Sequence, residues 1–190
     1  MNILFYDLET TGFDRKWCSI IEVAAILYSM DEHKILDTFH EYIKPMNPIP
    51  AQITELTGIT NKMVENCRTE PEVIRSFFAF AMGTTWEAIC GHNCKAFDNQ
   101  FMKAKGEKYN LPWEEVIAGK QIIDTYHLAK QFKKDGKIVG VSNLRQPTLA
   151  EYYGIDYEAH SAIEDVGALI KIYEAMTSEK GQQRKFGVLI

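Results

Sequence analysis

Three predicted β-strands lie within the N-terminal part of the chain, and their spacing restricts how it can fold. Apolar and β-branched residues dominate segments 3–8, 20–30 and 34–43, and the segment Gly12-Phe13-Asp14-Arg15 between the first two is typical of a turn. Strands this close in sequence are expected to pair as an antiparallel meander. A proline cluster at 45–50 then ends this part of the sheet, because proline cannot donate to the ladder.

The rest of the chain alternates between helical and extended patterns. Strands are predicted at 87–90 and 121–124, and helices at 51–56, 70–82, 97–105 (ending at Gly106), 125–133, 148–153 and 161–176. The last two helices are expected to begin with capping boxes, Thr148 with Glu151 and Ser161 with Glu164. This order predicts an α/β fold in which helices flank a mixed five-stranded sheet. A single domain is expected over 1–176, with a tail of unknown role at 177–190.

Two segments have no assigned role. Residues 133–146 are polar and contain glycine, and we favour a solvated hairpin over a loop that contacts a phosphate backbone. The tail is basic and ends in an apolar run, so it could dock on a partner or fold back on the core.

Composition indicates a globular domain. The 190 residues are 46% hydrophobic and 12% aromatic, and neither a membrane-spanning run nor a signal peptide is recognisable. We therefore expect a cytoplasmic protein with no membrane partner. Cys90 and Cys94 flank His92, but a zinc site needs four converging ligands, so buried reduced thiols are the better interpretation.

The net charge of −5 argues at first against a nucleic-acid partner. However, a site built from clustered acids is acidic in composition, and bound cations invert its local field. The net charge therefore decides little.

Paired acids follow the first predicted strand. Asp7 and Glu9 are two residues apart, so both carboxylates leave the same face of the sheet, where they repel each other unless a cation lies between them. Taken alone, the pair fits a solvated strand end equally well. Thr10, Thr11 and Gly12 come next, and such small residues let a nucleotide sugar approach the backbone closely.

Further acids and histidines recur at two later places. Gly91-His92-Asn93 follows the fourth predicted strand, and Phe97-Asp98 opens the next helix, where an acid also favours the helix dipole. His160 precedes the last helix, with Asp165 one turn into it.

Together these segments resemble the three motifs of the DEDDh exonucleases. The likeness extends from Asp7 to about residue 172 and is greatest to the proofreading (epsilon) subunits of bacterial replicative polymerases and their stand-alone relatives. The resemblance implies a ribonuclease H-like fold and two-metal hydrolysis that releases nucleoside monophosphates from a 3′ end. The preferred substrate would be single-stranded DNA, and a DNA polymerase or another replication or repair protein is a candidate partner.

The resemblance also implies roles for individual residues. Asp7 would bridge two Mg²⁺ or Mn²⁺ ions, with Glu9 and Asp165 completing one ion and Asp98 helping to hold the other. His160 would be the general base. The remaining candidates are substrate contacts: Thr10, Thr11, Gly12, Leu56, Thr57, His92, Asn93 and Phe97. Phe101 is expected in the core, and a structural turn role for His92 and Asn93 stays open.

Three other functions are compatible with the sequence. A relative that degrades RNA would carry the same acids, and no residue here unambiguously reads a 2′-hydroxyl. A non-catalytic adaptor should lack one of the five catalytic positions, and none is missing. An endonuclease of the same broad fold would cleave circular single strands.

Overall fold

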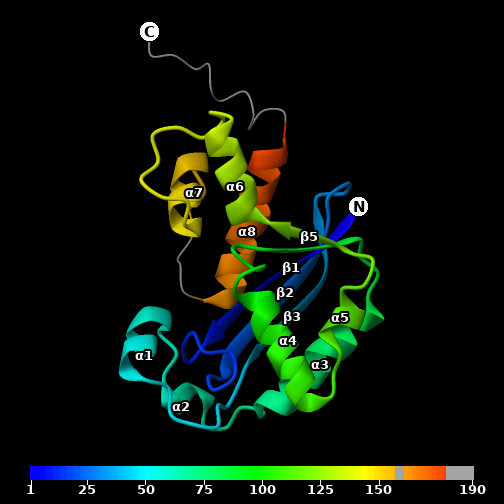
Figure 1. Ribbon diagram of the computed structural model, residues 1–190, viewed down its shortest axis with the longest axis vertical. Helices are drawn as coiled ribbons and strands as arrows, with labels where there is room; N and C mark the ends of the chain where they lie inside the picture. Colours follow the sequence, from blue (N-terminus) through cyan, green and yellow to red (C-terminus); the bar gives the residue numbers. More distant parts are fainter. Residues whose placement is uncertain (157–160, 179–190) are drawn as a thin grey trace.

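The computed structural model describes residues 1–156 and 161–178 and contains a five-stranded sheet in the order β3-β2-β1-β4-β5 (Figure 1). The strands are β1 (Asn2–Thr10), β2 (Ile20–Ser29), β3 (Lys34–Tyr42), β4 (Ala88–Gly91) and β5 (Gln121–Asp124). β1, β2 and β3 pair antiparallel, whereas β1, β4 and β5 run parallel. The predicted meander and mixed five-stranded sheet are therefore confirmed.

Helices cover both faces of this sheet. They are α1 (Ala51–Thr57), α2 (Asn61–Val64), α3 (Glu70–Gly83), α4 (Asp98–Tyr109), α5 (Trp113–Val116), α6 (Thr125–Lys134), α7 (Gln146–Tyr153) and α8 (Ala162–Thr177). No helix among the described residues is long and apolar enough to cross a membrane.

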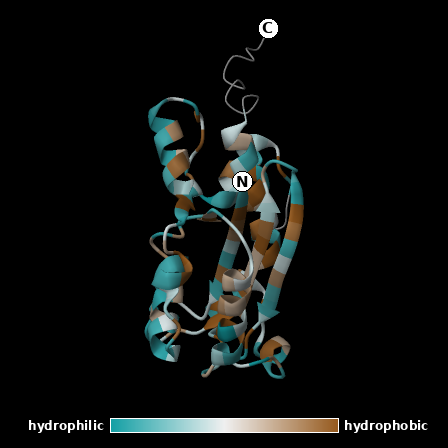
Figure 2. Ribbon diagram, turned by 90° about the vertical axis from the view of Figure 1, so that its right-hand side faces the viewer, coloured by the Kyte–Doolittle hydropathy of each residue, from teal (hydrophilic) through white to brown (hydrophobic). Residues whose placement is uncertain are grey.

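β1 separates two hydrophobic cores, because its side chains alternate between the two faces of the sheet. Leu4, Tyr6 and Leu8 pack with α3, α4 and α5. Ile3 and Phe5 pack against α8 on the opposite face. The central strands are correspondingly rich in apolar residues, and polar residues gather on the outer helix faces (Figure 2). The first strand therefore organises both layers.

The predicted end of α4 at Gly106 was wrong, since the helix continues to Tyr109. Gly106 is a helical residue whose missing side chain makes room for the following loop. A Cβ built there would lie 2.2 Å from the Leu111 carbonyl oxygen. Glycine is required at this position for close packing, and the helix is instead capped after Tyr109 by Asn110, which adopts the left-handed conformation.

The two predicted capping boxes do not form. α7 begins at Gln146, two residues earlier than predicted, and the Thr148 hydroxyl instead donates to Asn143 Oδ1 at 2.8 Å. Ser161 is the N-cap of α8, but its side chain makes no capping hydrogen bond. Glu22 of β2 accepts from the Ala162 N–H at 3.1 Å in its place. At the start of α8, a residue distant in sequence therefore accepts the hydrogen bond that the Ser161–Glu164 pattern had predicted to be local.

Segment 133–146 is not a hairpin. It contains the end of α6, a loop without strands and the first residue of α7, and Ile138 anchors the loop by inserting into the core between α6, α7 and α8. The short helices α2 and α5 were not predicted, because each spans only four residues.

Two glycine-to-alanine substitutions test the packing around α4. We expect Gly106→Ala to lower the free energy of unfolding by about 1–3 kcal/mol, because the added methyl group collides with backbone. Gly167→Ala in α8 is the matched control, since nothing lies within 4 Å of its added Cβ. The control should be neutral or stabilising by up to about 1 kcal/mol. Urea denaturation measures both, and equal effects would contradict the packing role of Gly106.

Candidate active site

Asp7 and Glu9 lie where β1 leaves the core. They continue the row of Ile3 and Phe5, so their carboxylates emerge on the face covered by α8. The strand pairs Asp7 with Ala24 and Glu9 with Glu22, and the register shifts between Glu9 and Thr10. The acids therefore project from a firmly paired strand just before its geometry changes.

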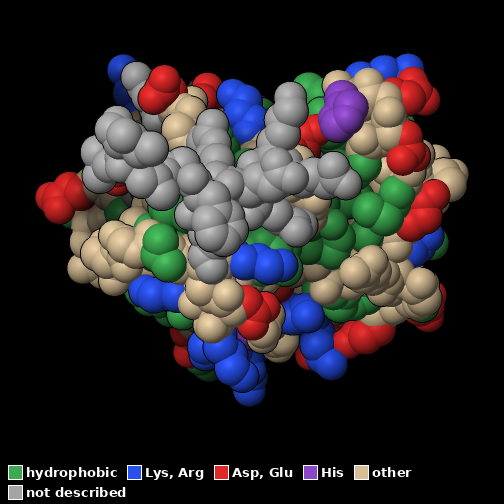
Figure 3. All heavy atoms as spheres, turned by 90° about the horizontal axis from the view of Figure 1, so that it is seen from above, with side chains coloured by type: hydrophobic (Ala, Val, Ile, Leu, Met, Phe, Trp, Pro, Cys, Tyr) green, Lys and Arg blue, Asp and Glu red, His purple; other side chains and the backbone are tan. Residues whose placement is uncertain are grey.

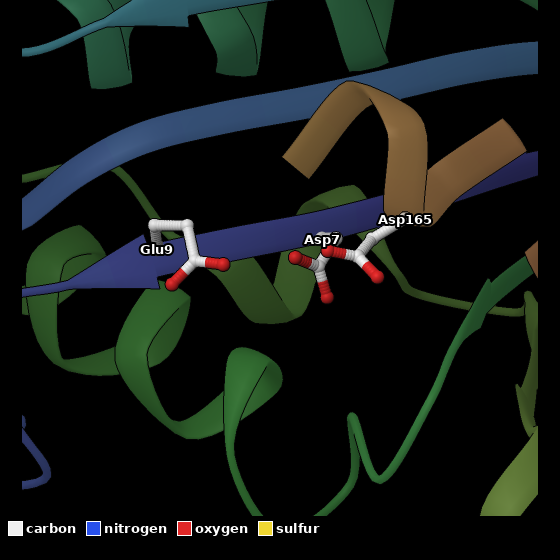
Figure 4. Close-up of side chains that lie close together, drawn as sticks. All are labelled: Asp7, Glu9 and Asp165. Atoms are coloured by element: carbon white, nitrogen blue, oxygen red, sulfur yellow. The ribbon is translucent and has the colours of Figure 1, made fainter. Parts of the chain in front are cut away.

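Asp165 completes an acidic trio from the first turn of α8. Figure 4 shows its carboxylate beside that of Asp7, with Glu9 further along β1. One carboxylate oxygen from each of the three residues lies within 4.8 Å of the others. Gln146 orients Asp165, because its Nε2 donates to the Asp165 carbonyl oxygen at 2.9 Å and to Oδ1 at 3.0 Å.

Asp98 approaches the same cleft from α4. It is the first residue of that helix and is 3% exposed. The Tyr6 hydroxyl donates to Oδ1 of the adjacent Asn99, which ties the start of α4 to β1. A cleft of about 360 Å³ brings Asp98 together with Asp7, Glu9 and Asp165. The structure thus gathers all four predicted acids, with Asp98 outside the compact trio.

The electrostatics of this cluster disfavour four negative charges. Burial, followed by repulsion from Asp98 and Glu9, raises the pKa of Asp7 well above its usual value. Burial and repulsion from Asp165 raise the pKa of Glu9 to about 8. Burial also raises the pKa of Asp98 to about 7, although backbone N–H groups of Asp98 and Leu8 oppose that shift.

This donor set fits divalent cations. It consists of carboxylate oxygens, which hard ions such as Mg²⁺ and Mn²⁺ prefer, and its repulsion is relieved when a cation binds. Metal binding to such groups releases protons, because the ligands must be ionised.

Three other predicted residues line the cleft: His92, Asn93 and Phe97. His92 Nδ1 lies 2.9 Å from the Thr125 hydroxyl, and burial lowers the pKa of this imidazole to about 4. It is therefore neutral near physiological pH. Asn93 has φ +61°, which turns the chain sharply after β4. Phe97 contacts the rings of Phe13 and Phe101, and Phe101 is in the core as expected.

The other predicted substrate contacts are not among the residues that line the cleft. Thr10 donates to the Gly12 carbonyl oxygen at 2.7 Å, and Thr11 Oγ1 accepts from the Ser19 N–H at 2.9 Å. Gly12 is confined by Cys18, whose Sγ would lie 2.9 Å from an added Cβ. Leu56 is exposed on α1, whereas Thr57 is buried and bonded to the Ile53 carbonyl oxygen.

The predicted general base, His160, lies outside the described residues, so its role stays a prediction. Cys90 and Cys94 are buried free thiols, and the described residues place no third metal ligand with them. Their interpretation as core residues is consistent with this placement.

Three residues that support the site were missed from the sequence: Glu22, Asp124 and Gln146. Asp124 ends β5 and accepts from the backbone N–H groups of Asn93 and Lys95, at 3.0 and 3.1 Å, so it fixes the turn before Asp98. Glu22 is fully buried and accepts both from Ala162 and from His40 Nε2 at 2.6 Å. An acid inside an apolar strand was the available signal for Glu22, whereas Gln146 had none.

Comparison with protein families decides the classification, because residues 4–173 match the model of the exonuclease family of RNase T. The chain belongs to the RNase T exonuclease family. This is the DEDD family of 3′→5′ exonucleases, whose members depend on metal ions, and the predicted resemblance is confirmed at this level.

The chain is also similar to individual curated proteins. It is 34% identical over 172 residues to the PolC-type DNA polymerase III of Caldanaerobacter subterraneus, which covers 90% of the chain and 11% of the polymerase. The chain thus spans about a tenth of the length of that relative.

Solved structures confirm the fold. The chain superposes on E. coli Exonuclease I in complex with a dT13 oligonucleotide with a TM-score of 0.84 at 19% identity, covering 94% of this chain and 41% of that one. An ExoI/SSB-Ct complex gives a TM-score of 0.78 at 19% identity, with coverages of 90% and 40%. At this identity the likeness establishes the ribonuclease H-like exonuclease fold alone.

The raised carboxyl pKa values predict how stability depends on pH in EDTA. Glu9 and Asp98 bind protons more tightly in the folded state than in the unfolded state, where their pKa values are near 4. Their stabilising contribution is therefore complete below about pH 4 and is lost as the pH rises through about 7 to 8. We expect the free energy of unfolding to fall across this range.

Asp98→Asn provides the comparison, because it removes one of the repelling charges. Urea denaturation at a series of pH values should show a shallower decline for this variant than for the wild type. Parallel curves for the two proteins would contradict the interpretation that burial raises the pKa of this carboxyl.

Proposed function

We propose that the chain is a divalent-cation-dependent 3′→5′ exonuclease that releases nucleoside monophosphates from single-stranded DNA. The observation that carries this proposal is the partly buried trio Asp7, Glu9 and Asp165, which have one carboxylate oxygen each within 4.8 Å of the others in a cleft that also contains Asp98. A surface salt-bridge role does not account for the trio, because no lysine or arginine lines this cleft among the described residues, and burial lowers the pKa of His92, which does line it, to about 4.

The four acids would hold two Mg²⁺ or Mn²⁺ ions, with Asp7 shared between them, Glu9 and Asp165 on one and Asp98 on the other. When bound, such ions supply Lewis-acid activation of water and neutralise charge on the phosphate. The chain itself contributes a fixed frame, since Gln146 holds Asp165 and Asn99 holds the start of α4 against β1.

His160 is proposed as the general base that takes a proton from the attacking water. Its place in the sequence, directly before Ser161 and α8, puts it five residues before Asp165. An ordinary imidazole pKa of about 6.5 suits proton transfer near neutral pH. His92 is a poor alternative, because burial lowers its pKa to about 4.

The proposed preference for DNA rests on the relatives. PolC-type polymerases are DNA polymerases, and the structural match is to a DNA complex. A DNA polymerase or another protein of replication or repair is the proposed partner class, and an ExoI/SSB-Ct complex among the matches is consistent with it.

Digestion of 5′-labelled oligonucleotides tests the reaction. We expect single-stranded DNA to give a one-nucleotide ladder that shortens from the 3′ end and disappears in EDTA, because the acids need cations. Matched RNA should be degraded more slowly, and circular single-stranded DNA should remain intact. Faster degradation of RNA would overturn the substrate preference, and cleavage of circles would overturn exonuclease action.

His160→Ala should lower kcat by about a hundredfold or more while leaving KM and cation binding nearly unchanged, because a general base acts in the chemical step. His33→Asn is the matched control, since His33 lies on the β2–β3 turn and pairs with Glu174. Steady-state kinetics at a saturating Mg²⁺ concentration measures both variants. A His160→Ala enzyme with normal kcat would remove this residue from the mechanism.

A further inference from the structure

The loop after β1 presents an exposed segment that the proposed chemistry does not use. Phe13 and Trp17 are 85% and 81% exposed, and Arg15 and Lys16 lie between them. Leaving large aromatic side chains in water is unfavourable, so their clustering with cations on one short loop indicates a binding surface.

This loop is held in place despite its exposure. The Thr11 N–H donates to the Ser19 carbonyl oxygen at 2.9 Å, and the Cys18 N–H donates to that of Asp14 at 2.7 Å. Lys105 reaches from α4 and donates to the Cys18 carbonyl oxygen. The loop is therefore ordered before any ligand binds, which lowers the entropic cost of binding.

The Lys105 anchor is itself buried. Its side chain is 2% exposed and its ammonium nitrogen lies 3.2 Å from Glu70 Oε1, and the same oxygen accepts from the Ile20 N–H at 2.7 Å. Lys105 of α4 and Glu70 of α3 thus hold the end of the loop in place by hydrogen bonds, at the point where β2 begins.

A groove extends from this loop along the outer face of α4. Its volume is about 540 Å³, and its lining includes Arg15 and Lys16 from the loop and Gln100, Lys103 and Lys108 from the helix. A hollow of about 430 Å³ lined by Phe13, Arg15 and Lys16 adjoins it. Phe13 also lines the catalytic cleft, so the hollow shares lining residues with both the groove and the cleft.

The groove is basic although the whole chain carries a net charge of −5. Lys103 pairs with Glu114 and Lys108 with Glu70, whereas Arg15 and Lys16 form no ion pair within residues 1–156 and 161–178. Glu107 is the one acid among the residues that line the groove, and Asp14 of the loop lines the adjoining hollow. By contrast, acids and bases are interspersed on the face seen from above (Figure 3).

We propose that this surface, the 13–17 loop with the outer face of α4, binds the single strand upstream of the nucleotide being removed. The inference rests on the proposed exonuclease function and adds a track for the substrate. Arg15, Lys16, Lys103 and Lys108 contact backbone phosphates, while Phe13 and Trp17 stack on bases. A cationic groove interleaved with exposed aromatics is how sequence-independent single-strand binding is achieved.

Intrinsic fluorescence tests binding independently of hydrolysis. The chain has three tryptophans, and Trp86 and Trp113 are 2% and 1% exposed, so Trp17 dominates solvent-sensitive emission. In EDTA, oligothymidylate of about 15 nucleotides should quench this emission and protect it from iodide. In the Trp17→Phe variant, the oligonucleotide should no longer quench the emission or protect it from iodide. Unchanged emission and iodide access at saturating oligonucleotide would overturn the proposal.

Charge reversal tests the phosphate contacts. Arg15→Glu/Lys16→Glu should raise KM for an oligonucleotide of about 15 nucleotides by about tenfold or more, and weaken the dependence of binding on salt. For a substrate of about three nucleotides, KM and kcat should stay within about twofold, because so short a strand occupies the cleft alone. Lys34→Glu/Lys171→Glu changes net charge equally at two exposed sites and should match the wild type.

The outcomes separate the two proposals. If the Arg15→Glu/Lys16→Glu variant hydrolyses the long and the short substrate with the KM of the wild type, the track is overturned and the exonuclease function stands. The loop would then be assigned to a protein partner. Quenching of Trp17 emission by the oligonucleotide without hydrolysis of any substrate would support the track and overturn the exonuclease function.

Discussion

Mutual repulsion among clustered carboxylates is the constraint on which the site depends. Asp7, Glu9 and Asp165 converge within 4.8 Å, and Asp98 adds a fourth acid to the same cleft. Burial and mutual repulsion raise the pKa of Asp7 well above its usual value, so the charged cluster is unfavourable without a counter-charge. A fold that retains such an arrangement gives up stability for function, as functional sites commonly do.

The scaffold holds these acids against their repulsion from several directions. β1 carries two of them on a stretch that pairs with β2, just beyond the residues that pair with β4. The α8 acid is restrained by Gln146, and the start of that helix is capped by the buried carboxylate of Glu22. Asp124 fixes the turn that leads to Asp98. Each support is a contact between residues distant in sequence, so the geometry is a property of the assembled sheet and its helices.

The sequence was sufficient for the elements whose pattern is local. The strand periodicity located all five strands, and the two-residue spacing of Asp7 and Glu9 placed both carboxylates on one face. It failed where a distant group decides the outcome. Gly106 was predicted to end a helix, but its missing side chain leaves room for the Leu111 carbonyl oxygen. Ser161 was predicted to cap α8 with its side chain, but Glu22 accepts the hydrogen bond from the Ala162 N–H. Gln146 was not recognisable, because its role exists only once α7 lies beside α8.

Calorimetric titration with Mn²⁺ tests the central claim that these acids exist to hold divalent cations. The wild-type protein should bind Mn²⁺ with higher affinity at about pH 8 than at about pH 6, because protons compete for carboxyls whose pKa values are raised. Asp7→Asn should lose most of this binding while remaining folded. Absence of binding by the wild type, or equal binding by Asp7→Asn, would contradict the account.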